Sequence, residues 1–221
     1  MTEKIVILDF GSQYTQLIAR RLRELNVFCE IYPYNKFPED DGSIKAVVLS
    51  GSPFSVLEED ALKLDLDTII NKYPILGICY GAQLIANNLG GKVLRSSKRE
   101  FGKAMLRATG ETCEILKDID SNPQVWMSHG DSILELPEGF RIIASTEGIP
   151  IAAYKSGTGQ FEKPIYGLQF HPEVFHSLCG KDILYNFVHE VAGCSADWTP
   201  AHFIDDTVAW IKEKIGRASC R

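Results

Sequence analysis

The sequence predicts an α/β protein built on a mostly parallel β-sheet. Across the first half of the 221-residue chain, short runs that are apolar throughout alternate with segments of helical periodicity. Strands that are apolar on both faces are typical of a parallel sheet covered by helices on both sides. The second half holds short β-like runs separated by turns, which predicts an antiparallel extension of the parallel core and hence a mixed sheet.

The first half supplies the parallel core. Its expected strands are Lys4–Asp9, Val27–Tyr32, Lys45–Leu49 and Ile75–Ile78. Apolar residues at helical spacing predict helices over Tyr14–Leu25, Glu58–Tyr73 and Ala82–Leu89. Each strand is followed by a turn or a helix, as in the βαβ units of a parallel sheet.

The second half changes character. Its expected strands are Lys92–Leu94, Met105–Ala108, Thr112–Leu116, Gln124–Met127, Phe140–Ser145, Ile151–Tyr154 and Pro164–Phe170. A helix is predicted over Lys181–Val191, stopped by Gly193. The composition then shifts, so we expect one domain over residues 1–193. We expect residues 194–221 to be a linker and an amphipathic helix at Phe203–Ile215.

Composition and charge narrow the classes of function. The net charge is −6, from 23 basic and 29 acidic residues without a basic block, which argues against binding to nucleic acid or a membrane surface. No signal peptide and no membrane-spanning apolar run are visible. The six cysteines show no Cys-x-x-Cys spacing, which favours reduced thiols over a disulfide framework or a zinc site. We therefore expect a cytoplasmic protein.

Cys79 lies at the point where a buried strand is expected to meet a helix. The segment Gly77-Ile78-Cys79-Tyr80-Gly81 places a glycine two residues to each side, so neighbouring backbone can pass close to the turn. The positive end of the following helix favours the thiolate over the thiol. This pattern is what a cysteine nucleophile needs. The alternative is a buried structural cysteine at a strand end.

The tripeptide His171-Pro172-Glu173 supplies a candidate base for Cys79. It follows an expected strand, at the end where open α/β sheets carry functional groups. Pro172 favours an extended His171, in which the side chains of His171 and Glu173 point to the same side. Glu173 could instead reach one ring nitrogen while the other faces the thiol, which makes a Cys-His-Glu relay. Alone, the tripeptide would more simply end a strand; beside the cysteine turn, we favour catalysis.

Two further turns are candidates for the same site. Acyl transfer needs backbone donors for an oxyanion, and the N–H of Tyr80 and the turn around Ser52 are expected to lie at the same sheet edge. The alternative for Ser52 is an ordinary turn. His129, in the polar turn Ser128–Asp131, is a second candidate base or a hydrogen-bonding residue. The carboxylates show no metal-ligand clustering, so no metal is expected.

Together these motifs resemble class I glutamine amidotransferase domains. Gly77–Gln83 and Phe170–Glu173 are similar to the signature pair of that family. The runs Asp9–Arg21, Arg99–Ala104 and Trp126–Ser132 narrow the resemblance to the glutaminase domain of the glutamine-hydrolysing GMP synthetase family. The resemblance covers Lys4 to about Val191. It implies a three-layer, flavodoxin-like fold and hydrolysis of L-glutamine to glutamate and ammonia.

The resemblance also implies roles for individual residues. Cys79 would be the nucleophile, His171 the base and Glu173 the orienting carboxylate, with a γ-glutamyl thioester as intermediate. The backbone amides of Tyr80 and Ser52 would form the oxyanion hole. The expected substrate-binding residues are Gln83, Ser128, His129, Gly130 and Asp131.

Two departures from the family pattern stand out. Ser52 stands where the family usually has glycine, so this turn is less free to aim its amide at a substrate. The synthetase phosphate loop is absent. We therefore expect a glutaminase domain cut from a longer enzyme, with residues 217–221 a candidate foreign tail. The linker and Phe203–Gly216 resemble the run that leads into an ATP-pyrophosphatase domain.

That absent domain would be the partner of this chain. The resemblance implies that it binds ATP and Mg²⁺, so no cofactor is expected in this chain. It would use the ammonia to aminate xanthosine monophosphate to GMP, and a homodimer could form through it. Two alternatives stay open: the glutaminase subunit of another synthase, such as anthranilate synthase, and a largely inactive glutamine-binding regulatory module.

Overall fold

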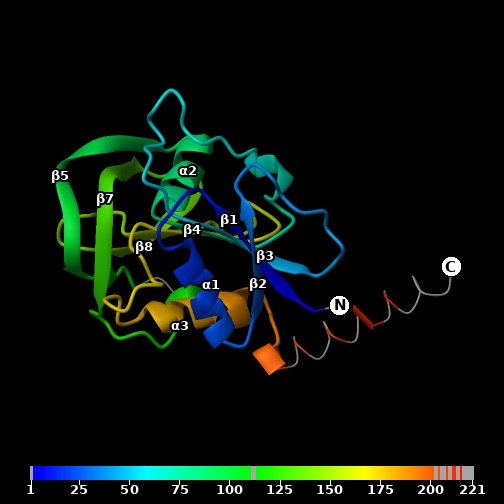
Figure 1. Ribbon diagram of the computed structural model, residues 1–221. Helices are drawn as coiled ribbons and strands as arrows, with labels where there is room; N and C mark the ends of the chain where they lie inside the picture. Colours follow the sequence, from blue (N-terminus) through cyan, green and yellow to red (C-terminus); the bar gives the residue numbers. More distant parts are fainter. Residues whose placement is uncertain are drawn as a thin grey trace.

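In the computed structural model, which describes residues 2–110 and 113–201 together with 204, 208, 211, 212 and 215, an eight-stranded sheet runs through the molecule (Figure 1). Its strands, in spatial order, are β2 (Phe28–Pro33), β1 (Lys4–Asp9), β3 (Ile44–Leu49), β4 (Ile75–Ile78), β10 (Ile165–Leu168), β9 (Ala153–Ser156), β8 (Phe140–Ser145) and β6 (Arg107–Ala108). The first five are parallel, and the last three add on antiparallel. The predicted mixed sheet is confirmed.

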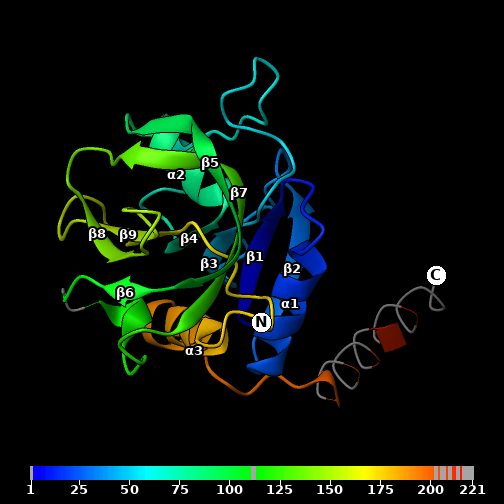
Figure 2. The same cartoon turned by 90° about the vertical axis from the view of Figure 1, so that its left-hand side faces the viewer.

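Helices cover both faces of this sheet. Helices α1 (Thr15–Glu24) and α3 (Gly180–Tyr185) lie on one face, and α2 (Tyr80–Asn88) lies on the other (Figures 1 and 2). A π-helix, η3 (Asn186–Val191), continues α3, so the predicted helix at Lys181–Val191 is present with a wider final turn. The buried apolar residues of β1 and β3 alternate between the two cores, as strands with apolar residues on both faces require.

A separate two-stranded antiparallel sheet lies beside the central one. It consists of β5 (Lys92–Met105) and β7 (Gln124–Glu135), both far longer than the short strands predicted there. Val125 and Met127 point into the core, whereas Phe101 and Lys103 are exposed. Polar runs inside these strands, Arg95–Glu100 and Ser128–Asp131, hide them from a search for apolar runs, which is why their length was underestimated.

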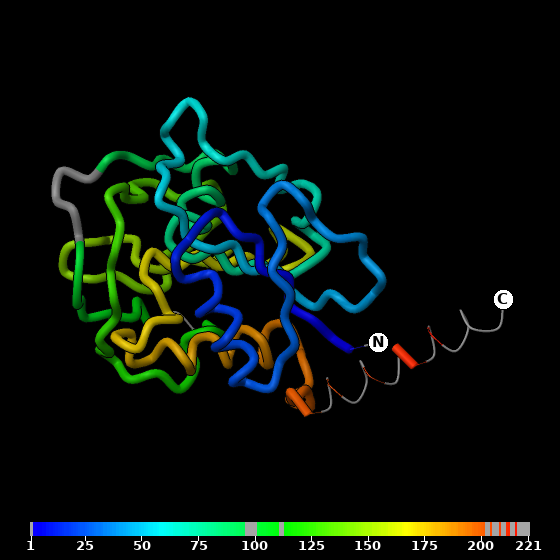
Figure 3. Tube along the Cα trace, viewed as in Figure 1, coloured from blue at the N-terminus to red at the C-terminus, as the bar shows by residue number. Residues whose placement is uncertain are grey.

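The helix predicted over Glu58–Tyr73 is wrong. The chain between β3 and β4 is a long loop, coloured light blue to teal in Figure 3, with a single 3₁₀ turn, η1 (Leu66–Thr68). Leu62, Leu64 and Leu66 recur at every second residue, which suits a loop lying along the core better than a helix. The Asp65 carboxylate accepts the N–H of Asp67 and so competes with helical hydrogen bonds.

The strand predicted over Thr112–Leu116 is also wrong within the described residues. Glu114–Leu116 forms a 3₁₀ turn, η2, whereas Thr112 lies outside the described part of the chain. The side-chain amide of Asn186 donates to the carbonyl oxygens of Ile115 and Lys117, at 3.3 and 2.8 Å. These bonds from a distant helix outweigh the local β propensity. Most of the helix predicted over Phe203–Ile215 also lies outside the described residues.

Candidate active site

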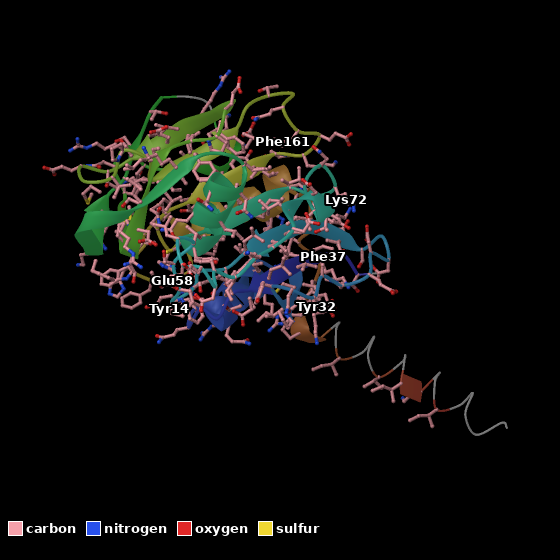
Figure 4. All side chains as sticks on the ribbon, turned by 90° about the horizontal axis from the view of Figure 1, so that it is seen from above. Tyr14, Tyr32, Phe37, Glu58, Lys72 and Phe161 are labelled. Atoms are coloured by element: carbon pink, nitrogen blue, oxygen red, sulfur yellow. The ribbon has the colours of Figure 1, made fainter. Side chains whose placement is uncertain are left out.

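The carboxyl ends of four parallel strands meet at one edge of the sheet. The turns after β1 and β3, Cys79 after β4 and the segment after β10 all line one cavity of about 690 Å³. The spatial order β2-β1-β3-β4-β10 reverses direction between β1 and β3, and ligands of open α/β sheets bind at such a reversal. Tyr14 and Glu58, which line this cavity, lie on the same side of the molecule in Figure 4.

Cys79 has a strained backbone. Its φ of 52° and ψ of −103° fall where side chains other than glycine are rarely found. The other described non-glycine residues with positive φ are Asn26, Asn71 and Asp118, whose short polar side chains tolerate this region. Strain at a cysteine that lines a cavity indicates a functional constraint on its position.

Two glycines make this turn sterically feasible. A Cβ on Gly77 would lie 2.7 Å from the amide nitrogen of Ala82, and one on Gly81 would lie 2.5 Å from the Leu49 carbonyl oxygen. The amide of Gly81 donates to the Ser50 carbonyl oxygen, at 3.2 Å. The close approach predicted for these glycines is therefore observed, and it fixes Cys79 at the start of α2.

The cysteine side chain is nearly buried but lines the cavity. It is 6% exposed, and its thiol lies 3.7 Å from the Ser128 carbonyl oxygen. Tyr80 is the first residue of α2, where backbone N–H groups have no acceptor within the helix. Ser52 lines the same cavity, and a Cβ on the neighbouring Gly51 would lie 3.4 Å from Cε1 of His171. Both expected oxyanion donors thus belong to residues of the cavity.

His171 and Glu173 form a buried pair. Nδ1 of His171 lies 2.7 Å from Oε1 of Glu173, and because an ionised carboxylate only accepts, Nδ1 carries the proton. Burial opposes a charge on the ring, but the Glu173 carboxylate and Cys79 together raise the pKa of His171 well above its ordinary value. The protonated form of the His171 ring is therefore favoured beside the Cys79 thiol.

The segment that carries this pair is a turn from Pro172 onward, not the extended segment predicted. The strand also ends earlier than predicted, at Leu168. Nε of Arg21 donates to the Glu173 carbonyl oxygen at 2.9 Å. A Cβ on Gly180 would lie 1.9 Å from the Pro172 carbonyl oxygen, so the turn rests directly on the start of α3. These tertiary contacts bend the chain.

His129 is a second buried histidine on the cavity wall. It is 4% exposed, and neither ring nitrogen makes a hydrogen bond within the protein. Burial lowers the pKa of His129, against a weaker opposing effect of the Asp131 backbone, and His171 lowers it further. A neutral imidazole offers one donor and one acceptor, so this ring is equipped to bind a polar ligand.

The other expected substrate residues gather around β7. Nε2 of Gln83 donates to the Asp131 carbonyl oxygen at 2.9 Å. The carboxylate of Asp131 accepts a hydrogen bond from Ser55, in the loop between β3 and β4. Ser128 and Gly130 line the cavity with them. The structure therefore brings every predicted site residue to one cavity except Glu173, which lies behind His171.

Several cavity residues were missed by sequence reasoning. They are Gly11, Ser12, Gln13, Tyr14, Pro53, Phe54, Ser55, Glu58, Arg95 and Phe101. The ring of Tyr14 meets that of His171 edge-on, with centroids 5.2 Å apart. In the sequence, Gly11–Tyr14 directly follow a strand and, like Phe101, fall in the runs that resemble the family, whereas no local pattern indicates Ser55, Glu58 or Arg95.

The remaining histidines lie away from this cavity or outside the described chain. His176 stacks on Trp126, with ring centroids 4.3 Å apart, and His189 hydrogen-bonds backbone carbonyls; His202 is not among the described residues. Within the described residues no cluster of three or more metal-binding side chains occurs. None of the described helices has the length and apolar character needed to span a membrane.

Residues 6–191 match the family described as glutamine amidotransferase class-I. The chain belongs to this family. The predicted amidotransferase membership and fold are confirmed, and the strained Cys79 lies within the matched residues.

Amidotransferases in solved structures share this fold. A putative GMP synthase subunit from Thermoplasma acidophilum is 33% identical, with a TM-score of 0.74 over 87% of this chain and 95% of that one. A glutamine amidotransferase from Thermotoga maritima has a TM-score of 0.70 over 87% of this chain and 99% of that one; at 17% identity it shows the fold alone.

The curated relatives are longer than this chain. A glutamine-hydrolysing GMP synthase of Cytophaga hutchinsonii is 57% identical over 217 residues, and one of Bacteroides thetaiotaomicron is 56% identical over 216 residues. Each alignment covers 98% of this chain but 42% of the relative. The chain therefore spans less than half the length of the curated relatives that it matches.

Proposed function

We propose that this amidotransferase hydrolyses L-glutamine to glutamate and ammonia through Cys79, His171 and Glu173. The observation that carries the proposal is the strained Cys79 beside a buried His171–Glu173 pair, with cysteine and histidine on one cavity wall. Nucleophile, base and orienting carboxylate in this order are the parts that covalent acyl transfer needs.

The first step is attack by the Cys79 thiolate on the side-chain amide carbon of glutamine. A C–S bond forms, and the carbonyl oxygen becomes an oxyanion facing the backbone amides of Tyr80 and Ser52. The C–N bond then breaks, and His171 gives its proton to the departing nitrogen, which leaves as ammonia. The product on the enzyme is a γ-glutamyl thioester. Glu173 stabilises the charged ring before transfer and holds it in place throughout.

The second step is hydrolysis of the thioester. The ring of His171, now neutral, takes a proton from water as the water oxygen attacks the thioester carbon. The C–S bond breaks, glutamate leaves, and the thiolate–imidazolium pair is restored. One ring thus acts as acid in the first step and as base in the second, which requires its pKa to be shifted by neighbours.

The cavity offers groups that suit a free amino acid. His129 has buried nitrogens without a hydrogen bond within the protein, and Gln83, Ser128 and Asp131 lie on the same wall. Arg95 and Glu58 add one positive and one negative side chain, which match the charges of the glutamine carboxylate and ammonium groups. Unpaired polar groups that a substrate satisfies give strong discrimination against substrates lacking its polar groups.

The ammonia serves the amination of xanthosine monophosphate to GMP in this proposal. Support comes from the 57% and 56% identical relatives, whose names give GMP synthase activity. The partner is a synthetase domain, to which we assign the binding of ATP and Mg²⁺. Incubating the chain with ¹⁵N-amide glutamine, ATP, xanthosine monophosphate and candidate synthetase partners tests this destination. Label in GMP supports it, whereas label only in anthranilate with an anthranilate synthase partner contradicts it.

Glutaminase chemistry is tested by labelling with a diazo-ketone analogue of glutamine. Intact mass and peptide mapping should show one adduct, on Cys79, that excess glutamine prevents. Cys79→Ala should take no label, should lose glutamine turnover by at least about a thousandfold, and should still bind glutamine. Normal hydrolysis by Cys79→Ala would refute the mechanism. Glutamine binding by a folded, reduced wild type without label or turnover would favour a regulatory module.

A further inference from the structure

The backbone of His171 is held from both sides by one strand. Its N–H donates to the Trp126 carbonyl oxygen, at 3.0 Å, across to β7. Its carbonyl oxygen accepts the hydroxyl of Ser177, at 2.6 Å, and that hydroxyl in turn accepts the N–H of Trp126, at 2.9 Å. Both backbone groups of the candidate base are therefore tied to one residue of β7, one directly and one through Ser177.

Ser177 is itself well fixed. It is 5% exposed, and its backbone N–H donates to the Val174 carbonyl oxygen at 3.1 Å, which closes the turn after Glu173. On either side, Nε2 of Gln124 donates to the His176 carbonyl oxygen, and the Leu178 N–H donates to the Gln124 carbonyl oxygen. The hydroxyl thus bridges two segments that are already ordered, so its hydrogen bonds form at little entropic cost.

We propose that Ser177 is a positioning residue for His171, holding the catalytic ring in register with the substrate-binding residues of β7. This inference rests on the proposed glutaminase function. The same strand carries Ser128, His129 and Asp131 on the cavity wall, only a few residues from Trp126. A shift of the histidine turn relative to β7 therefore changes the distance between base and substrate.

The bridge acts on the ring through its position. The hydrogen bonds of the Ser177 hydroxyl go to backbone groups, so its loss frees the backbone carbonyl of His171 and changes the ring only by loosening its contacts with Glu173 and Cys79. A displacement of about 1 Å in a catalytic group costs about a hundredfold in rate. The thiol, the oxyanion donors and the binding residues stay in place, because none of them hydrogen-bonds Ser177.

The test compares Ser177→Ala and Ser177→Thr with the control Ser156→Ala. Ser156 is also buried, and its hydroxyl accepts the N–H of Ile165, at the far end of β10 from His171. We expect Ser177→Ala to lower kcat for glutamine by about tenfold to a hundredfold with KM nearly unchanged. Ser177→Thr, which keeps the hydroxyl, and Ser156→Ala should keep the wild-type kcat, although Ser156→Ala also loses a buried hydrogen bond.

A second measurement follows the ring itself. In Ser177→Ala, looser contact with Glu173 and Cys79 should lower the pKa of His171, so the alkaline limb of the pH–rate profile moves to lower pH. The ¹H and ¹⁵N resonances of the His171 Nδ1–H group should report the same loosening without substrate. These resonances test Ser177 even if wild type hydrolyses no glutamine, which would refute the proposed function alone.

Three results would overturn the proposal. One is a wild-type kcat and pH profile in folded Ser177→Ala. Another is an equal loss of kcat in Ser156→Ala and Ser177→Ala, which would mean general destabilisation. The third is an unchanged His171 Nδ1–H resonance in Ser177→Ala, which would show that the hydroxyl does not position the ring.

Discussion

At the scale of single residues, two histidines on one cavity wall are driven toward opposite charge states. His171 has a carboxylate on one side and a thiol on the other, which together overcome burial and raise its pKa. At His129 burial outweighs the opposing effect of Asp131 and lowers the pKa. Environments that push pKa values apart assign acid–base roles. The charged ring is suited to proton transfer and the neutral one to ligand binding.

Glu173→Gln tests the charge on His171 through stability. The folded pKa of His171 lies above the unfolded value of about 6.5, so the pair stabilises the fold fully below that pH. This contribution is lost as the pH rises through the folded pKa. The loss of unfolding free energy in Glu173→Gln should therefore be larger at pH 6 than in strongly alkaline solution, as urea titrations can measure. A loss that grows with pH would contradict this assignment.

The same variant separates orientation from proton transfer. Glutamine keeps an oxygen that can accept the Nδ1–H but carries no charge. Because Glu173 acts through His171, kcat should remain about tenfold to a hundredfold higher in Glu173→Gln than in His171→Ala. Equal losses in kcat would show that the carboxylate does more than hold and charge the ring.

How much of the site the sequence predicts depends on how far apart the contacting residues lie in the chain. Cys79, His171 and Glu173 are predictable because each belongs to a short motif at a strand end. Ser55 meets Asp131 across 76 residues, and Arg21 meets Glu173 across 152 residues. Such contacts depend on the register of loops and helices packed over the sheet, and no local pattern encodes that register.

At the scale of secondary-structure elements, the β4–α2 turn depends on how closely α2 approaches β3. Gly81→Ala places a methyl group 2.5 Å from the Leu49 carbonyl oxygen, and backbone cannot move aside as a flexible side chain can. We expect a loss of about 1–3 kcal/mol in unfolding free energy, together with a lower kcat because Cys79 moves with α2. Gly130→Ala is the control for stability, because its Cβ meets no atom within 4 Å. Equal stability of both variants would contradict the tight packing.

Elements also differ in how well sequence predicts them. The predicted ends of β1 and β8 agree with the observed ones, because turns on both sides of a mostly apolar run fix where the strand begins and ends. The helix predicted over Glu58–Tyr73 failed because leucines at alternate positions serve a loop lying on the core equally well. Strand β5 was predicted too short because the polar run Arg95–Glu100 interrupts its apolar residues.

At the scale of the whole molecule, rigidity is concentrated where the site is built. Strands β1, β3, β4 and β10 are buried on both faces, whereas β6 is an exposed two-residue edge strand. In native-state hydrogen exchange, amides of the four central strands should exchange only through global unfolding. Those of β6 should exchange by local opening that denaturant barely affects. Exchange of β4 amides as fast as that of β6 amides would contradict this distribution.

The positive φ of Cys79 has a consequence for the evolution of the chain. Such a backbone costs about 1–3 kcal/mol with an ordinary side chain and almost nothing with glycine. Glycine at position 79 would therefore relieve the backbone strain, but it would also remove the nucleophile. A gain in stability favours glycine at position 79, whereas selection for activity keeps cysteine there. In a lineage that no longer needed the reaction, we therefore expect Cys79→Gly to be among the first changes.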